Sequence, residues 1–175
     1  MTMRRGFMGL AIVSILVIGI LFVGSVPQAG AETMKAKGVT TVTKLDALPI
    51  PDEEGHALVL QTLQGLFLFE NGEIAKSTAY AIADTNPAKG AQAWGYIYLT
   101  FEDGSTIMQK IQRSMTTDKR GNYDATMSGE LLKGAGRFAG IKGTTSSTGK
   151  NFLASKGEAM RLFTDMTFTY TLPGK

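Results

Sequence analysis

Apolar and polar positions alternate along most of the chain from residue 38 onward, and this alternation predicts strands. Apolar residues at the helical spacing i, i+3, i+4, i+7 do not recur over any long stretch. The clearest alternation lies in residues 91–102. One face of this segment carries Trp94, Tyr96 and Tyr98, and the other carries Ile97, Leu99 and Phe101. The pattern therefore predicts an all-β protein.

The runs of strand-forming residues are separated by short segments of turn chemistry. Asn71-Gly72 and Asp103-Gly104 suit tight hairpin turns, because glycine and asparagine tolerate positive φ. We also expect turns at Asp118–Asn122 and at Gly149-Lys150. The predicted strands span residues 38–45, 57–69, 73–84, 91–102, 106–115, 123–132 and 141–148, with one broken or two short strands in 152–172.

Several of these segments are apolar or small on both faces, which is not typical of a sheet with one face in water. Closing the sheet into a barrel removes its exposed edges. The chain ends directly after the alternating run Thr167–Leu172, which favours pairing of the last strand with the first. We therefore predict an all-β fold, a single closed eight-stranded antiparallel β-barrel in meander order, with no second domain.

The N-terminus has the three parts of a secretory signal. Arg4 and Arg5 precede an uncharged run over residues 6–26, and Pro27 and the small residues Ala29-Gly30-Ala31 follow. The run is also near the lower limit for a membrane span, but Ala-x-Ala after a helix breaker favours cleavage. We expect a Sec-type signal peptide over residues 1–31, cleavage after Ala31, a barrel domain over residues 32–175, no membrane anchor after cleavage, and a periplasmic or secreted location.

Composition excludes several function classes. The chain has no cysteine, and therefore neither disulfides nor thiolate metal sites. Without Arg4 and Arg5 the mature chain carries 16 Lys and Arg against 15 Asp and Glu. No basic run exceeds Lys119-Arg120, which argues against nucleic-acid and anionic-lipid partners. With one histidine in the chain, we expect no metal site and no cofactor.

The stretch Gly134-Ala-Gly136-Arg-Phe138-Ala-Gly140-Ile-Lys-Gly143, followed by a Thr/Ser-rich strand, resembles bacterial proteins of the allene oxide cyclase-like barrel group. Plant dirigent proteins share that barrel and a similar Gly-x-Gly-x-Phe turn. The segments Glu54-Gly55-His56 and Thr100–Thr106 also resemble exported bacterial members of the group. The resemblance implies an eight-stranded barrel with a cavity, and Phe138 is expected to plug one end. The short motifs do not align the catalytic residues of the cyclase with this chain position by position, so none is carried over.

Two sets of residues are candidates for ligand binding. Trp94, Tyr96 and Tyr98 share one strand face, where they would line a cavity if it points inward, or cover the barrel if it points outward. His56 is the lone histidine, beside Glu53 and Glu54, and is either a general base or a turn residue at the rim. We favour the rim for His56 and leave the direction of the aromatic face open.

Arg113 is the third candidate for ligand binding. It shares a face with Ile107, Gln109, Ile111 and Met115. If this face is interior, Arg113 is a buried cation that needs a partner, which Glu70, Glu102 or Glu130 would supply. We expect the exterior placement, as ordinary solvated surface.

The sequence is compatible with three functions and disfavours a fourth. The first is a binding module for a small apolar or amphipathic molecule. The second is a cyclase- or isomerase-type enzyme with a polar constellation around His56 or Arg113. The third is a structural, homo-oligomerising envelope protein. An outer-membrane barrel is disfavoured, because the chain ends in Pro173-Gly174-Lys175 and lacks a continuous lipid-facing band.

Overall fold

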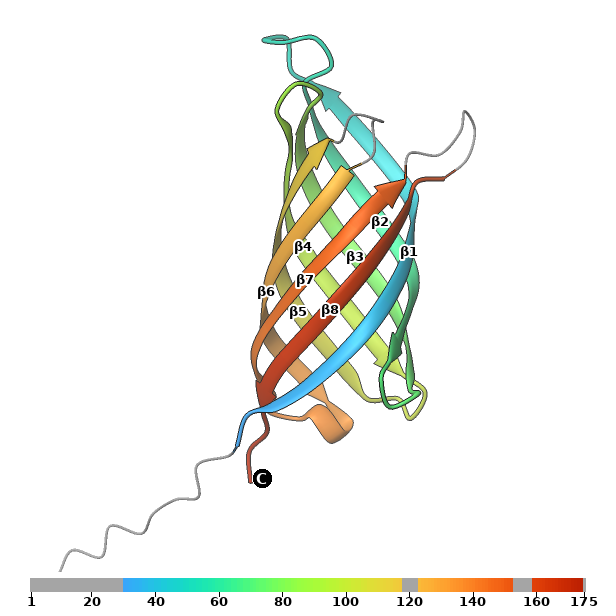
Figure 1. Ribbon diagram of the computed structural model, residues 1–175, viewed down its shortest axis with the longest axis vertical. Coiled ribbons are helices and arrows are strands. Elements are labelled where there is room, and N and C mark those ends of the chain that lie inside the picture. The colour runs from blue at the N-terminus through green and yellow to red at the C-terminus, as the bar shows by residue number, and fades with distance from the viewer. Residues whose placement is uncertain (1–29, 118–122, 153–158, 175) are drawn as a thin grey trace, which may run out of the picture.

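Eight strands form the protein in its computed structural model, which describes residues 30–117, 123–152 and 159–174. A single turn of 3-10 helix, η1 (Gly136–Phe138), lies between the sixth and seventh strands (Figure 1). The strands are β1 (Glu32–Pro49), β2 (Ala57–Phe69), β3 (Ile74–Asn86), β4 (Gly90–Phe101), β5 (Thr106–Thr117), β6 (Tyr123–Ala135), β7 (Lys142–Phe152) and β8 (Arg161–Thr171).

Each strand pairs antiparallel with the next, and β1 pairs antiparallel with β8, which closes the barrel. The closing seam runs from Glu32 opposite Tyr170 to Thr41 opposite Arg161. The predicted closed, eight-stranded meander is therefore confirmed. The turns at Asn71-Gly72 and Asp103-Gly104 are confirmed as well, with φ values of 87° at Gly72 and 80° at Gly104.

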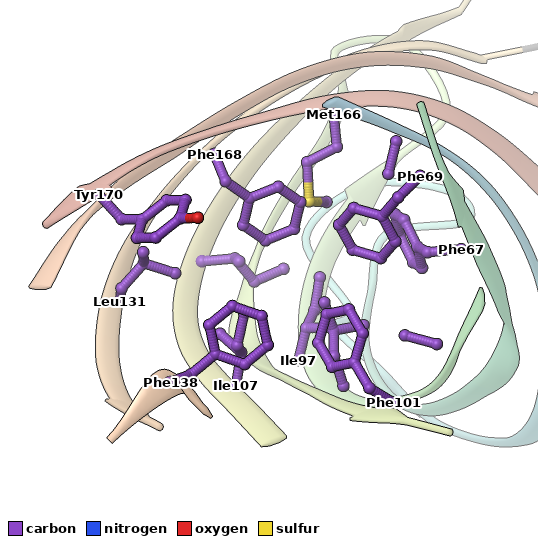
Figure 2. Packing of buried hydrophobic residues seen from close by; sticks show 14 of the residues in the cluster. Phe67, Phe69, Ile97, Phe101, Ile107, Leu131, Phe138, Met166, Phe168 and Tyr170 are labelled. Carbon is purple, nitrogen blue, oxygen red and sulfur yellow. The ribbon is translucent and has the colours of Figure 1, made fainter. Parts of the chain in front are cut away.

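The end of the barrel where β1 begins and β8 ends is filled by aromatic side chains (Figures 1 and 2). We call it the closed end and define it by Phe69, Phe101, Phe138, Phe168 and Tyr170, all of them buried. The Phe138 ring from η1 lies 4.9 Å from that of Phe101, which confirms the expected plug. Arg137 stacks over Phe101 and Phe138, both ring centroids 4.8 Å from its Cζ atom, and so covers this core from outside.

Alanine side chains line most of the opposite end of the barrel interior. We call it the small-residue end and define it by Ala83, Ala91, Ala93, Met115 and Ala125. Successive side chains of a strand alternate between the two faces of the sheet, so both ends are built from alternate positions of the same strands. On β4, for example, the inward positions change from Ala91 and Ala93 to Leu99 and Phe101 along the strand.

The structure corrects several strand boundaries, and the largest changes are in β1 and β7. Strand β1 was expected over residues 38–45, but it begins at Glu32 and extends to Pro49. Beyond Val42, whose N–H donates to the carbonyl of Met160, its pairing within the described residues is with β2 alone, and proline is tolerated on a strand side without a pairing partner. The turn predicted at Gly149-Lys150 is wrong, since both residues lie inside β7. The predicted signal peptide falls almost wholly outside the described residues, as does the predicted turn at residues 118–122, and both stay predictions.

Candidate functional site

The structure does not bring the five predicted binding residues together. Trp94, Tyr96 and Tyr98 point away from the barrel and are 43–44% exposed. His56 lies on the rim, where the loop before β2 ends. Arg113 points into the barrel, so the expected exterior placement of its face is wrong. The alternation on β5 places Ile107 and Ile111 in the core, and Arg113 follows them inward.

Arg113 is held by a neutral group. Its Nη2 atom donates a hydrogen bond to Oδ1 of Asn151 at 2.8 Å. Asn151 is itself buried on β7 and donates to the sulfur of Met115. Burial lowers the pKa of Arg113 to about 10, so the guanidinium keeps its charge at neutral pH. None of Glu70, Glu102 and Glu130 forms an ion pair with Arg113 in the part of the chain that the structure describes.

A small cavity lies inside the barrel beside Arg113, with a volume of about 50 Å³. Its apolar wall includes Leu63, Phe67 and Ile111. Its polar groups come from Thr40, Ser77, Arg113, Ser147 and Thr164. Ser77 is 3% exposed, and within the described residues its Oγ atom is buried without a hydrogen-bond partner. We call this space the Arg113 cavity.

A satisfied polar pair lies between the Arg113 cavity and the closed end. Gln109 is fully buried on β5 and accepts a hydrogen bond from the hydroxyl of Thr145 at 2.5 Å. Its amide nitrogen donates to the sulfur of Met166 at 3.6 Å. Gly129 makes room for the pair, because a Cβ there would lie 2.4 Å from Oγ1 of Thr145. The side chains of Gln109 and Thr145 therefore have hydrogen-bond partners, whereas the Ser77 hydroxyl has none among the described residues.

His56 joins the loop between β1 and β2 to the barrel wall. Its Nδ1 atom lies 2.5 Å from a carboxylate oxygen of Asp52, and its Nε2 atom lies 2.9 Å from one of Asp84 on β3. The hydrogen bonds to Asp52 and then Asp84 raise the pKa of His56. Glu53 adds contacts to the β3–β4 turn, at 2.5 Å to Asn86 and 2.6 Å to Lys89. A histidine with both ring nitrogens paired to carboxylates is suited to hold this loop.

Outside the barrel, uncharged side chains cover the middle of β2, β3 and β4. Cross-strand pairing aligns Leu60 with Ile82 and Ile82 with Trp94 in one row, and Tyr80 with Tyr96 in the next. These side chains are 39–58% exposed. We call this surface the aromatic face and define it by Leu60, Tyr80, Ile82, Trp94, Tyr96 and Tyr98. An aromatic patch of this kind marks a candidate contact surface.

Two larger hollows lie against the outer surface around β1, β7 and β8, with volumes of about 660 and 850 Å³. Lys37 and Asp165 line both and pair with each other at 2.7 Å. Their charges are therefore already matched. The Arg113 cavity differs, because its cation and its Ser77 hydroxyl are enclosed by the barrel.

Sequence reasoning missed Ser77 and Asn151. The alternate positions Ala75, Ser77, Ala79, Ala81 and Ala83 form a row of small residues, and this row indicates an inward face that includes Ser77. Asn151 was missed because the predicted turn at Gly149-Lys150 ended the strand at residue 148, whereas β7 continues to Phe152.

The sequence matches no model of a known protein family, and a search of curated proteins gives no match either. Solved structures do match. The pterocarpan synthase dirigent proteins GePTS1 and PsPTS1 are each 11% identical, with TM-scores of 0.49; the matches cover 93% and 84% of this chain and 98% and 99% of theirs. A β-barrel-like protein from Acinetobacter baumannii AYE is 14% identical with a TM-score of 0.51, over 82% of this chain and 98% of its own.

At 14% identity, the likeness to the Acinetobacter baumannii protein shows a shared β-barrel fold. Over residues 30–117, 123–152 and 159–174 there is no helix long and apolar enough to cross a membrane.

Proposed function

We propose that the protein works outside the cytoplasm and binds a small amphipathic molecule inside its barrel. The observation that carries this proposal is the Arg113 cavity, which combines apolar walls with a few converging polar groups. Ligand sites in proteins have this composition. The predicted signal peptide supports the location.

Binding is favoured over catalysis by the chemistry of the available groups. Arg113 keeps its proton at neutral pH and is therefore unsuited to proton transfer. His56 lies on the rim with both ring nitrogens paired, and it does not line the cavity. A guanidinium beside neutral hydroxyl and amide groups is suited to hold a ligand rather than to convert it.

Native mass spectrometry of the mature protein, purified gently from its own envelope, tests the proposal. Wild type is expected to retain a small molecule. Ala79 lines the cavity, so Ala79→Leu should fill the space and lose the molecule. Thr78→Leu, at the neighbouring outward position of β3, is the matched control and should retain it. Ala79→Val repeats the test with a smaller change.

An empty wild-type protein would overturn the proposal, as would equal retention by Ala79→Leu. Trp94 cannot replace this measurement. The only tryptophan of the chain lies on the aromatic face, so its fluorescence reports on the outer surface.

For the aromatic face we infer a second role, as the contact between two copies of this chain. Its four aromatic side chains are 43–58% exposed. Since each can bury about 150–250 Å², they offer roughly 400 Å² together, about half of the ~800 Å² per partner in a standard interface. Leu60 and Ile82 extend the same surface. None of the six residues that define the aromatic face is charged; the exposed Lys110, opposite Tyr96 on β5, lies at its border.

Sedimentation of the mature protein tests this second role. Wild type is expected to form an oligomer that Tyr80→Glu with Tyr96→Glu dissociates. The matched control is Ser146→Glu with Thr167→Glu, at exposed or partly exposed positions of β7 and β8, which should leave the oligomer intact. A wild-type monomer, or an oligomer that the tyrosine variant leaves unchanged, would overturn the role.

A further inference from the structure

Arg113 is a permanent cation in an apolar part of the barrel wall. Its direct cross-strand neighbours are Ala93 on β4 and Met127 on β6. Its hydrogen bond to the Asn151 amide supplies a dipole but no charge. A charged group removed from water is costly unless a counter-charge is near. No Asp or Glu of the described residues lies within ion-pair distance of it, so the charge lacks a counter-ion there.

Ser77 provides an independent indication of a missing ligand. Its hydroxyl lines the same cavity, is almost fully buried and has no hydrogen-bond partner among the described residues. Buried polar groups in folded proteins are nearly always paired, and an unpaired one costs about as much as a lost hydrogen bond. The Gln109–Thr145 pair shows that this barrel does satisfy its buried polar groups elsewhere. The hydroxyl without a hydrogen-bond partner and the cation without a counter-ion among the described residues therefore both lie at the Arg113 cavity.

The size of the cavity limits what it can hold. One water molecule needs roughly 10–15 Å³ of cavity volume. The cavity has about 50 Å³, which corresponds to about three to five non-hydrogen atoms. A carboxylate group with one or two carbon atoms behind it is of this size.

We propose that the Arg113 cavity binds the carboxylate of a singly charged ligand. The Arg113 guanidinium faces the two carboxylate oxygens, and the Ser77 hydroxyl donates a hydrogen bond to one of them. Arginine suits this role, because its planar donors match a carboxylate. One cation among apolar walls favours a single negative charge over a doubly charged phosphate. This inference rests on the proposed binding function and adds the class of head group.

Calorimetric titration with straight-chain carboxylates tests the inference, using formate, acetate, propionate, butyrate and hexanoate at constant ionic strength. The matching primary amides have nearly the same shape but no charge. Acetate and propionate are expected to bind at least tenfold more tightly than acetamide and propionamide. Arg113→Met should abolish this preference, and Ser77→Ala should weaken it severalfold.

Arg161→Met is the matched control, because Arg161 is exposed on β8. It should leave the preference for carboxylates unchanged. Arg113→Met removes a buried charge and is expected to fold, and Arg113→Lys gives a second test, since it keeps the charge but loses the planar donors. Equal binding of carboxylates and amides, or an unchanged preference in Arg113→Met, would overturn the head-group inference while leaving the binding function standing.

The chain-length series separates the two proposals. If affinity rises about three- to fourfold per methylene up to hexanoate, the interior takes an amphipathic molecule as proposed. If affinity stops rising at propionate, the carboxylate site stands and the amphipathic ligand is wrong. If no carboxylate or amide of the series binds, the head-group inference is overturned, and the retained-ligand experiment decides the binding function.

Discussion

The two ends of the barrel interior are built from the same eight strands and differ in what fills them. At the closed end, the ring centroid of Phe69 lies 5.1 Å from that of Phe101 and 5.8 Å from that of Phe168. At the small-residue end, alanines occupy the equivalent inward positions, and Arg113 and Asn151 lie among them. The difference teaches that one β-barrel can hold tightly packed aromatic rings at one end of its axis and buried polar groups at the other.

The largest expected effect comes from the closed end. Phe168 is fully buried, so Phe168→Ala should lower the free energy of unfolding by about 3–5 kcal/mol. Phe163, on the outer side of the same strand and 44% exposed, is the control, and Phe163→Ala should cost about 1 kcal/mol or less. Urea denaturation followed by circular dichroism measures both. Equal costs would show that the aromatic packing is not what stabilises this end.

The polar layer between the two ends should give the next largest effect. Gly129→Ala places a Cβ against Oγ1 of Thr145 and 2.9 Å from Oε1 of Gln109. Overpacking of this kind costs about 1–3 kcal/mol. The same denaturation experiment measures it, with Ser128→Ala, on the outward side of β6, as the control. If Gly129→Ala left the free energy of unfolding unchanged, the Gln109–Thr145 layer would be able to accommodate the added methyl group.

Removing the buried charge at the small-residue end should stabilise the protein, whereas the two changes above destabilise it. Arg113→Met is expected to raise the free energy of unfolding by about 1 kcal/mol, because an apolar side chain replaces a cation without a described counter-ion. Thermal unfolding in ligand-free buffer measures this. A large loss of stability would mean that the guanidinium is compensated inside the barrel and is not held ready for a ligand.

The smallest expected effect is a dependence of local stability on pH, which should appear at the small-residue end and not at the closed end. The pKa of His56 is raised above its ordinary value of 6.5, so its stabilising contribution is complete below about pH 6.5 and is lost as the pH rises through the raised value. The pKa of Asp52 is lowered by its hydrogen bond to His56, so Asp52 stays ionised through this range. The loop between β1 and β2 should therefore loosen in alkali.

Hydrogen exchange of residues 50–56 at pH 5.5 and pH 9, corrected for intrinsic rates, measures this loosening, and His56→Gln should remove the difference. At the closed end, the pKa of Glu73 is lowered by Asn71 and Arg137, and that of Asp103 mainly by the backbone N–H of Ser105. Both carboxylates stay ionised between pH 5.5 and 9, so protection of the turns there should not change. Equal loosening at both ends would contradict the assignment to His56.

The fold could be predicted from the sequence because period-two alternation and turn residues are local signals. They located β2 at its observed bounds and the turns at Gly72 and Gly104. The direction of each strand face is not a local property. On β5, an alternation that includes Arg113 was read as solvated surface, since a cation is rarely interior. The closed barrel turned that face inward, together with Ile107 and Ile111.

The candidate site was harder to predict for the same reason. Trp94, Tyr96 and Tyr98 were correctly placed on one face, but only the closure of the sheet decides that this face is outside. The partners of Arg113 depend on strands far apart in the sequence, since Asn151 lies on β7. Nothing local in either segment indicates that the two side chains meet.

The seam between β1 and β8 also limits when the barrel can close during folding. The hydroxyl of Tyr170 donates to the carboxylate of Glu32 across 138 positions of sequence, whereas every other strand pair joins neighbours along the chain. Seven hairpins can form as the chain emerges, but the ring closes only with its last strand. Until then the free edges of β1 and β7 are open to pairing with other chains. The β1–β8 pairing is thus the least local contact in this barrel, and contacts of this kind slow folding.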